Sequence, residues 1–245
     1  MANRVYPIRP DLPDHRDRLF VAPPSKGLTS VDLRPEMPPV YDQGQLGSCS
    51  ANAIGGSIQF LTKSYMPSRL FIYYNERLLQ GTVAQDSGAY LRYGMKATQQ
   101  YGACPETDWP YDIAKFAEAP PAPCYKEALP DRVHSYYRIP VDANCVTPVR
   151  AALEHGIPVV IGIVVYPSFE SQYTAETGIV MLPALNEQPL GGHAILIVGF
   201  DDSRNAFIVR NSWGTDWGMG GYFYLPYNYV NNPQLTMSLW VIQTV

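Results

Sequence analysis

The sequence predicts an α+β protein with a helical first half and a β-rich second half. In the first half, apolar residues recur at helical spacing in three stretches, residues 48–61, 70–80 and 89–102. From about residue 130, short apolar runs rich in Val, Ile and Tyr alternate with turn residues, which is the pattern of strands. Helices that are segregated from strands in this way define the α+β class.

Composition agrees with a folded globular protein. The chain has 245 residues, of which 46% are hydrophobic and 16% charged, enough for one large domain or for two lobes that share an interface. The formal net charge is −4 and no long basic run occurs, so nothing favours a nucleic acid or an anionic membrane surface as a partner. The longest apolar runs have the length of strands, and we therefore expect no membrane span. We also expect a monomer.

Residues 1–27 form a polar, proline-rich arm without periodicity, ahead of a domain that spans 28–245. Pro7, Pro10 and Pro13 favour an extended backbone that cannot coil into a helix. The arm also lacks the apolar core of a secretory signal, which is compatible with a cytoplasmic protein or with a trimmed secreted precursor. Within the domain we predict a helical lobe at about 40–128 and a β lobe at about 129–245.

The predicted elements follow one another in a clear order. The helix over residues 48–61 has Ser48 as its expected N-cap, and Gly55 and Gly56 are expected to let it pack closely against the opposite lobe. The third helix is expected to end before Gly102. Strands are predicted over residues 132–139, 157–166, 193–200, 206–213 and 221–227, with one intervening helix at about 148–155.

The run QGQLGSC ends at Cys49, at the start of the first helix, and places the side-chain amide of Gln43 six positions upstream. A helix N-terminus presents unpaired N–H groups and the positive end of the dipole, and both favour the thiolate. Because the thiolate is the nucleophilic form, Cys49 is the candidate nucleophile rather than a buried core thiol. The other three cysteines, Cys104, Cys124 and Cys145, have no comparable surroundings.

His193 and Asn211 are the candidate partners of this thiol. His193 follows a Gly-Gly turn and opens an apolar strand, so the imidazole would lie beside a flexible backbone on a rigid support. Asn211 opens the run NSWGTDWG, and its alternative is a turn-forming role. Cys, His and Asn, far apart and in this order, are typical of thiol acyl transfer. The remaining histidines lie in the arm, at a strand start and at a helix end: His15, His134 and His155.

These motifs resemble those of the papain-like cysteine peptidases. Residues 46–50 read LGSCS, similar to the family signature C-G-[SA]-C-[WY], and His193 follows Cys49 by 144 residues, inside the family's window of about 130–150. Asn211 follows by 162 residues, slightly outside it. The stretch LTSVDLR resembles the start of a mature family domain, and YGACPETDWPY resembles its Tyr-Pro-Tyr segment. The resemblance covers residues 28–245 and indicates a bacterial-type member with a short N-terminal extension.

The resemblance implies two lobes, the second sheet-like or barrel-like, with the active-site cleft between them. It also implies a cysteine endopeptidase that acts on peptides or proteins through a thioacyl-enzyme intermediate. Cys49 would be the nucleophile, His193 the base and Asn211 the group that orients the imidazole. Gln43 would donate a hydrogen bond to the oxyanion. A shielding indole at Trp213 would keep water from the His–Asn bond.

The resemblance also suggests which residues line the substrate cleft. Gly88 would offer exposed backbone to an extended substrate, while Asp86 beside it is equally well explained as a turn residue. Tyr90, Gly162 and Ala194 would line the pocket for the penultimate acyl residue, the one before the residue whose carbonyl is attacked. The expected substrate-binding set is completed by two further residues: Gly192 and Trp213.

Several alternatives stay open at this stage. The same thioacyl intermediate is also compatible with a transpeptidase or acyltransferase, and a third possibility is a catalytically silent peptide-binding relative. Leu46 replaces the first Cys of the signature and removes the disulfide that many secreted members have. Cys104 and Cys124 are expected to be neighbours and reduced.

No cofactor is expected, because the sequence has no Cys/His cluster with metal spacing, no phosphate loop and no Rossmann fingerprint. The arm, as a candidate short pro-segment, would either cross the cleft as an intramolecular inhibitor, or pack elsewhere as a strap or be disordered.

Overall fold

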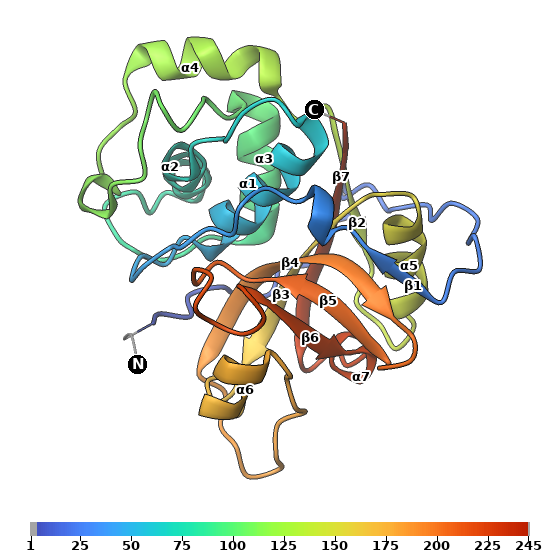
Figure 1. Ribbon diagram of the computed structural model, residues 1–245. Coiled ribbons are helices and arrows are strands. Elements are labelled where there is room, and N and C mark those ends of the chain that lie inside the picture. The colour runs from blue at the N-terminus through green and yellow to red at the C-terminus, as the bar shows by residue number, and fades with distance from the viewer. Residues whose placement is uncertain (1–3, 245) are drawn as a thin grey trace.

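The computed structural model describes residues 4–244, and its first part is helical as predicted. Helix α1 (Cys49–Thr62), α2 (Arg69–Gln80) and α3 (Leu91–Tyr101) pack together, and the shorter α4 (Ala122–Ala128) lies beside them (Figure 1). Helix α3 ends before Gly102, which has a φ of +76°. This left-handed conformation suits glycine and explains why the helix stops there.

The second part is one antiparallel sheet with the strand order β2-β7-β3-β4-β5-β6, while β1 pairs with β4 beside this path. Among the described residues no pairing joins β2 to β6, so the sheet is open and is not a closed barrel. The α+β prediction is therefore confirmed, with an open sheet in the second lobe. The strand bounds are β1 (Ser30–Asp32), β2 (Ser135–Ile139), β3 (Val159–Val165), β4 (Gly191–Asp201), β5 (Ala206–Arg210), β6 (Tyr222–Pro226) and β7 (Thr236–Thr244).

Some elements were missed or differ from the prediction. Strand β7 was not predicted, although it lies between β2 and β3 in the sheet. Strand β1 and the short helices α4, α6 (Gln172–Thr177) and α7 (Tyr227–Val230) were also missed. Helix α5 (Val146–Glu154) begins two residues earlier than expected. Three 3₁₀ turns complete the chain: Arg34–Glu36, Ile113–Lys115 and Leu129–Asp131.

Helix α1 joins the two halves. On one side a Cβ at Gly56 would lie 3.4 Å from Leu196 of β4, so the lack of a side chain lets the helix approach the sheet. Gly55 instead faces the neighbouring helix, where a Cβ would lie 3.5 Å from the side chain of Arg69. The prediction that the helix packs closely on the other half thus holds for Gly56. The start of α1 is consequently placed against the middle of the sheet.

The N-cap prediction for Ser48 holds for its position and not for its side chain. Ser48 occupies the N-cap position, but its side chain accepts no hydrogen bond from the helix backbone. Its hydroxyl instead meets the hydroxyl of Tyr111 and the side-chain amide of Asn52. A tertiary contact therefore outweighs local capping at this position.

The arm runs along the junction of the two halves before it joins β1 (Figure 1). Two parts of it differ in their contacts: residues 4–9, here called the cleft segment, and residues 11–27, here called the strap. The cleft segment bridges to Gly192 at the start of β4. The strap bridges through Leu19 to Arg138 of β2.

Candidate active site

Cys49 is the first residue of α1 and is fully buried. Burial raises the pKa of its thiol to about 12, while backbone N–H groups, first of all that of Ala194, act in the opposite direction. The helix start was expected to favour the thiolate. In this closed site desolvation outweighs the helix terminus, because a charge loses more by leaving water than it gains from partial charges.

His193 lies on β4, and Asn211 directly follows β5, so the β lobe carries both. The Nε2 atom of His193 lies 2.9 Å from Oδ1 of Asn211, and both side chains are buried. The residue after His193, Ala194, offers its backbone N–H to the Cys49 sulfur. This contact brings Cys49 of the helical lobe to the strand that carries the imidazole.

An aromatic cluster shields the His193–Asn211 bond. The imidazole stacks on Trp213 with ring centroids 4.8 Å apart, as expected for a shielding indole. Trp217 and Phe169 extend the cluster, with their rings 5.0 and 5.7 Å from Trp213. Burial lowers the pKa of His193 to about 4, and the bond to Asn211 counteracts this in part. In the closed site the imidazole is therefore neutral.

Gln43 reaches the site from a loop before α1, and contacts from both lobes fix its amide. Its Oε1 accepts a hydrogen bond of 2.6 Å from the hydroxyl of Ser212, and its Nε2 donates one of 3.0 Å to the Leu46 carbonyl. A side-chain amide nitrogen carries two N–H groups, so one remains for a ligand. This N–H and the backbone N–H of Cys49 are the candidate oxyanion donors.

The cleft segment covers these residues. Its Tyr6 carbonyl accepts a hydrogen bond of 3.1 Å from the N–H of Gly192, and its Ile8 N–H donates one of 3.2 Å to the Gly192 carbonyl. Tyr6 also meets the Glu170 carboxylate through its hydroxyl, and Arg4 lies over the Trp213 ring at 4.0 Å. The covering explains why Cys49 and His193 are 0% and 1% exposed.

The residues expected to bind substrate lie against this segment. A Cβ at Gly88 would approach the Pro7 side chain to 2.4 Å, so only glycine leaves room for that ring. A Cβ at Gly162 would lie 3.5 Å from the buried Ile8, in a pocket shared with Leu91 and Met237. Tyr90 lines a hollow beside Pro7 and Arg9. Ala194 sits behind this surface, with its N–H on the Cys49 sulfur.

Two of these pocket residues were not found from the sequence. Leu91 directly follows Tyr90 and was hidden among the other apolar residues of its helix. Met237 lies on the unpredicted strand β7. Asp86, for which only a turn role or an undefined function was expected, accepts the N–H of Gly47 at 3.0 Å and the hydroxyl of Tyr73. It thereby ties the loop before the nucleophile to the wall that carries Gly88.

All four cysteines are free thiols, which agrees with the expected reduced state of Cys104 and Cys124. These two thiols are in contact with each other within one small apolar cluster, as their proximity in the sequence motif suggested. Within residues 4–244, no group of three or more His, Cys, Asp and Glu side chains is placed to hold a metal ion. No helix in the same range has both the length and the apolar character to cross a membrane.

The sequence and the fold both match known proteases. The sequence model described as papain family cysteine protease matches residues 28–241. A peptidase C1-like protein of Acanthamoeba polyphaga mimivirus is 44% identical over 89% of this chain and 74% of its own length. Cathepsin K of Gallus gallus is 30% identical over 83% of this chain and 60% of its own length.

A solved structure resembles the whole chain. The crystal structure of xylellain, a cysteine protease from Xylella fastidiosa, is 38% identical with a TM-score of 0.89, covering 100% of this chain and 97% of that one. The structure of digestive procathepsin L 3 of Tenebrio molitor shares the fold at 21% identity, with a TM-score of 0.71. The expected family is thus confirmed, and the chain belongs to the papain family of cysteine proteases.

Proposed function

We propose that this protease is an endopeptidase with a Cys49–His193–Asn211 mechanism. The observation that carries the proposal is the His193–Asn211 bond of 2.9 Å. Ala194, the residue directly after His193, contacts the Cys49 sulfur through its backbone and so places the thiol beside this pair. The imidazole takes the thiol proton, and the sulfur attacks the peptide carbonyl carbon. Asn211 holds the ring in one orientation without taking a charge.

The proton and the bonds balance over two half-reactions. The C–N bond breaks as the thioester forms, and the imidazolium returns its proton to the leaving amine. Water then adds to the thioester with the imidazole as base, and the C–S bond breaks to give the acid and the free thiol. Gln43 and the Cys49 N–H stabilise the negative oxygen in both steps.

We further propose that the cleft segment inhibits the enzyme, as a pro-segment would. Its direction supports this role. A leaving amine must receive its proton from His193, so the C-terminal part of a substrate lies toward His193 and Trp213. The cleft segment runs the other way, with Arg4 at Trp213 and the later Ile8 beside Gly162. A chain bound with reversed polarity fills the cleft without presenting a peptide bond in the reactive orientation.

Hydrolysis of internally quenched peptides with an aliphatic penultimate acyl residue tests the mechanism. The full-length chain carrying Ile8→Asp, which buries a charge in the Ile8 pocket and so unseats the segment, is the parent. We expect Cys49→Ala and His193→Ala in this parent to abolish turnover, and Asn211→Ala to leave a reduced but measurable rate. Turnover that survives Cys49→Ala in protein free of contaminating protease would refute the mechanism.

The same assay separates hydrolysis from transfer. An added amine should leave the products unchanged if water resolves the thioester, and mass spectrometry of the products reads this directly. Amide products in place of acids would instead identify a transpeptidase or acyltransferase. Iodoacetamide labelling without any turnover would point to a silent peptide-binding relative.

A further inference from the structure

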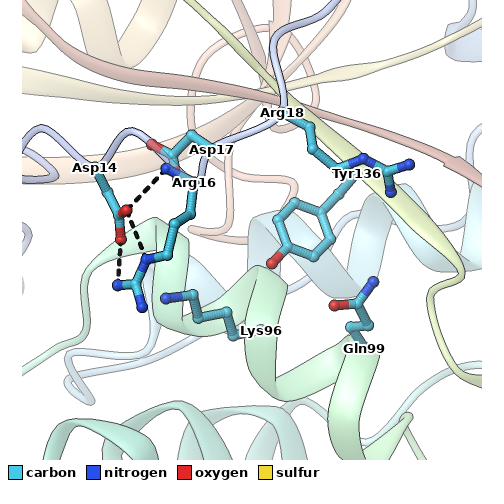
Figure 2. Close-up of a pocket in the computed structure, with 7 residues that line it drawn as sticks. All are labelled: Asp14, Arg16, Asp17, Arg18, Lys96, Gln99 and Tyr136. Carbon is cyan, nitrogen blue, oxygen red and sulfur yellow. Dashed lines mark hydrogen bonds and ion pairs between the residues drawn. The ribbon is translucent and has the colours of Figure 1, made fainter.

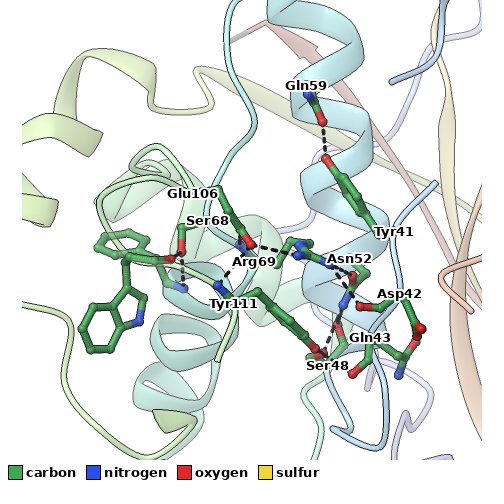
Figure 3. A network of polar contacts seen from close by, with 12 residues as sticks. Tyr41, Asp42, Gln43, Ser48, Asn52, Gln59, Ser68, Arg69, Glu106 and Tyr111 are labelled. Carbon is green, nitrogen blue, oxygen red and sulfur yellow. Dashed lines mark hydrogen bonds and ion pairs between the residues drawn. The ribbon is translucent and has the colours of Figure 1, made fainter. Parts of the chain in front are cut away.

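The loop that carries Gln43 rests on the hydroxyl of Tyr111, a residue far along the helical lobe (Figure 3). This hydroxyl donates a hydrogen bond of 3.0 Å to the Gln43 carbonyl and also meets the hydroxyl of Ser48. Gln43 is one candidate oxyanion donor, and Ser48 directly precedes Cys49, whose N–H is the other. A single phenol thus contacts the carbonyl of one donor residue and the side chain of the residue that precedes the other.

The hydrogen bonds around this phenol run in one direction. The side-chain amide of Asn52 donates to the Ser48 hydroxyl at 3.0 Å and to the Ser48 carbonyl at 2.9 Å. Since the Tyr111 proton goes to Gln43, the Ser48 hydroxyl must donate to the Tyr111 oxygen. Burial raises the pKa of Tyr111 to about 12, so the phenol keeps its proton at neutral pH.

Arg69 contacts two members of this hydrogen-bonded chain, Tyr111 and Asn52 (Figure 3). Its guanidinium lies over the Tyr111 ring at 4.0 Å and donates to Oδ1 of Asn52 at 3.2 Å and to the Asp42 carbonyl at 3.3 Å. An ion pair of 2.8 Å joins it to Glu106, which also accepts the N–H of Tyr111 at 3.1 Å. Arg69 is 7% exposed, so its charge acts in a largely dry environment where these contacts are strong.

Gln43 is held from the opposite lobe as well. Its N–H donates 2.9 Å to the Ser212 carbonyl, and its Oε1 accepts from the Ser212 hydroxyl. These contacts leave the Gln43 carbonyl to the helical lobe, where Tyr111 takes it. Gln43 is therefore fixed from both lobes: Ser212 holds its N–H and side chain, and the phenol holds its carbonyl from the helical side.

We propose that Tyr111 is a positioning residue that sets the spacing of the two oxyanion donors, the Gln43 side chain and the Cys49 N–H. It acts through Gln43 and Ser48 and makes no contact with substrate. The proposal rests on the proposed peptidase function of this site. Hydrogen-bond donors stabilise the transition state only when they are fixed at the position where the negative oxygen forms. Loss of this restraint therefore reduces turnover rather than substrate binding.

The test compares Tyr111→Phe with Tyr125→Phe, both in the full-length Ile8→Asp parent. Tyr125 is a matched control, because it is also half-buried in the helical lobe and its hydroxyl donates one bond of 3.0 Å, to Asn75 away from the site. We expect Tyr111→Phe to lower kcat about tenfold with KM nearly unchanged, a smaller loss than removal of an oxyanion donor itself. Tyr125→Phe is expected to keep the parent kcat.

Alkylation by iodoacetamide provides the second readout. The thiolate displaces iodide in that reaction and no oxyanion forms, so a specific defect in the oxyanion site should leave the alkylation rate of Cys49 within about twofold of the parent. Equal losses of alkylation and kcat, or equal kcat in the two Phe variants, would overturn the proposal.

Amide hydrogen exchange over residues 43–48 measures the restraint without any turnover. Exchange is expected to be faster in Tyr111→Phe and unchanged in Tyr125→Phe, and unchanged exchange in both would count against the role of Tyr111. If hydrogen exchange differs between the two Phe variants as expected but the parent hydrolyses no peptide, the proposed function is refuted. The restraint by Tyr111 is then still supported.

Discussion

The cleft segment and the strap are adjacent in the sequence but are held in different ways. The cleft segment depends on main-chain bonds to Gly192 and on one buried apolar side chain, Ile8. The strap depends on buried charged groups. Asp11, 5% exposed, accepts bonds from the N–H of Arg92 at 3.1 Å and from the indole of Trp240 at 2.8 Å.

Further contacts hold the strap along its length. Asp17 forms ion pairs with Arg92 and Arg138 at 2.6 and 3.3 Å. Near its end, the carboxylate of Glu154 accepts the N–H of Lys26 at 2.6 Å. The strap also forms part of the wall of a polar hollow (Figure 2), which is lined by Asp14, Arg16, Asp17, Arg18, Lys96, Gln99 and Tyr136.

This difference indicates separate roles for the two parts of the arm. Main-chain bonds and an apolar side chain are contacts that a peptide substrate can replace. By contrast, removing one partner of a buried charged group leaves the other partner unsatisfied and destabilises the protein. The strap is therefore expected to be needed for the stability of the fold. The arm thus combines a segment across the cleft, which we propose to be inhibitory, with a segment that packs as a strap.

Two deletions should separate these roles most clearly. Removal of residues 1–9 is expected to raise kcat/KM by about 10- to 100-fold, since burying one Ile side chain is worth about 1.5–3 kcal/mol. The alkylation rate of Cys49 should rise with it. Removal of residues 1–26 is expected to lower Tm sharply, because Arg92 and Trp240 lose their buried acceptor. An unchanged kcat/KM in the folded shorter variant would reject inhibition.

The strap is tested within the full chain by Asp11→Ala. We expect a loss of about 2–4 kcal/mol in the free energy of unfolding, because buried donors on Arg92 and Trp240 remain without acceptors. Chemical denaturation measures this loss. Asp14→Ala is the matched control, since within residues 4–244 Asp14 forms its ion pair with the exposed Arg16, and its removal should leave the denaturation midpoint nearly unchanged. Equal midpoints for the two variants would contradict a structural strap.

The pH dependence of Cys49 alkylation tests whether the cleft segment controls the ionisation of the site. In the closed site burial raises the pKa of Cys49 to about 12 and lowers that of His193 to about 4, so both groups are neutral near pH 7. Opening the cleft should shift the thiol pKa downward and the imidazole pKa upward. The alkylation profile of the chain without residues 1–9 should therefore extend to lower pH than that of the full chain. Superimposable profiles would show that the segment does not control ionisation.

The smallest expected effect concerns the pocket that Ile8 fills. Gly162→Val would place methyl groups where the Ile8 side chain lies, since a Cβ at this position would lie 3.5 Å from it. With residues 1–9 removed, we expect an apolar or aromatic penultimate acyl residue to be preferred, and the substitution to reduce kcat/KM for aromatic residues about tenfold. A peptide library read by mass spectrometry measures this. Preference for a basic residue there would reject the assignment of the pocket.

The fold class, the family and the candidate residues for catalysis could all be predicted from local sequence patterns. Helical spacing fixed α1 and placed Cys49 at its start, and the apolar run after Gly192 fixed β4 and placed His193 on it. These are local patterns, in which the periodicity of burial is visible along the chain. The roles of Cys49, His193 and Asn211 stay a proposal until they are measured.

Contacts between residues far apart in the chain could not be predicted and became visible in the folded protein. Asp11 meets Trp240 at a separation of 229 residues, and Tyr111 meets Gln43 at 68. Neither pair has a local signature, because a buried acceptor and its donor need only meet in space. The same holds for the thiol, whose pKa the helix start was expected to lower. Burial under the cleft segment, a segment 40 residues upstream, raises it instead, since desolvation depends on everything that surrounds a group.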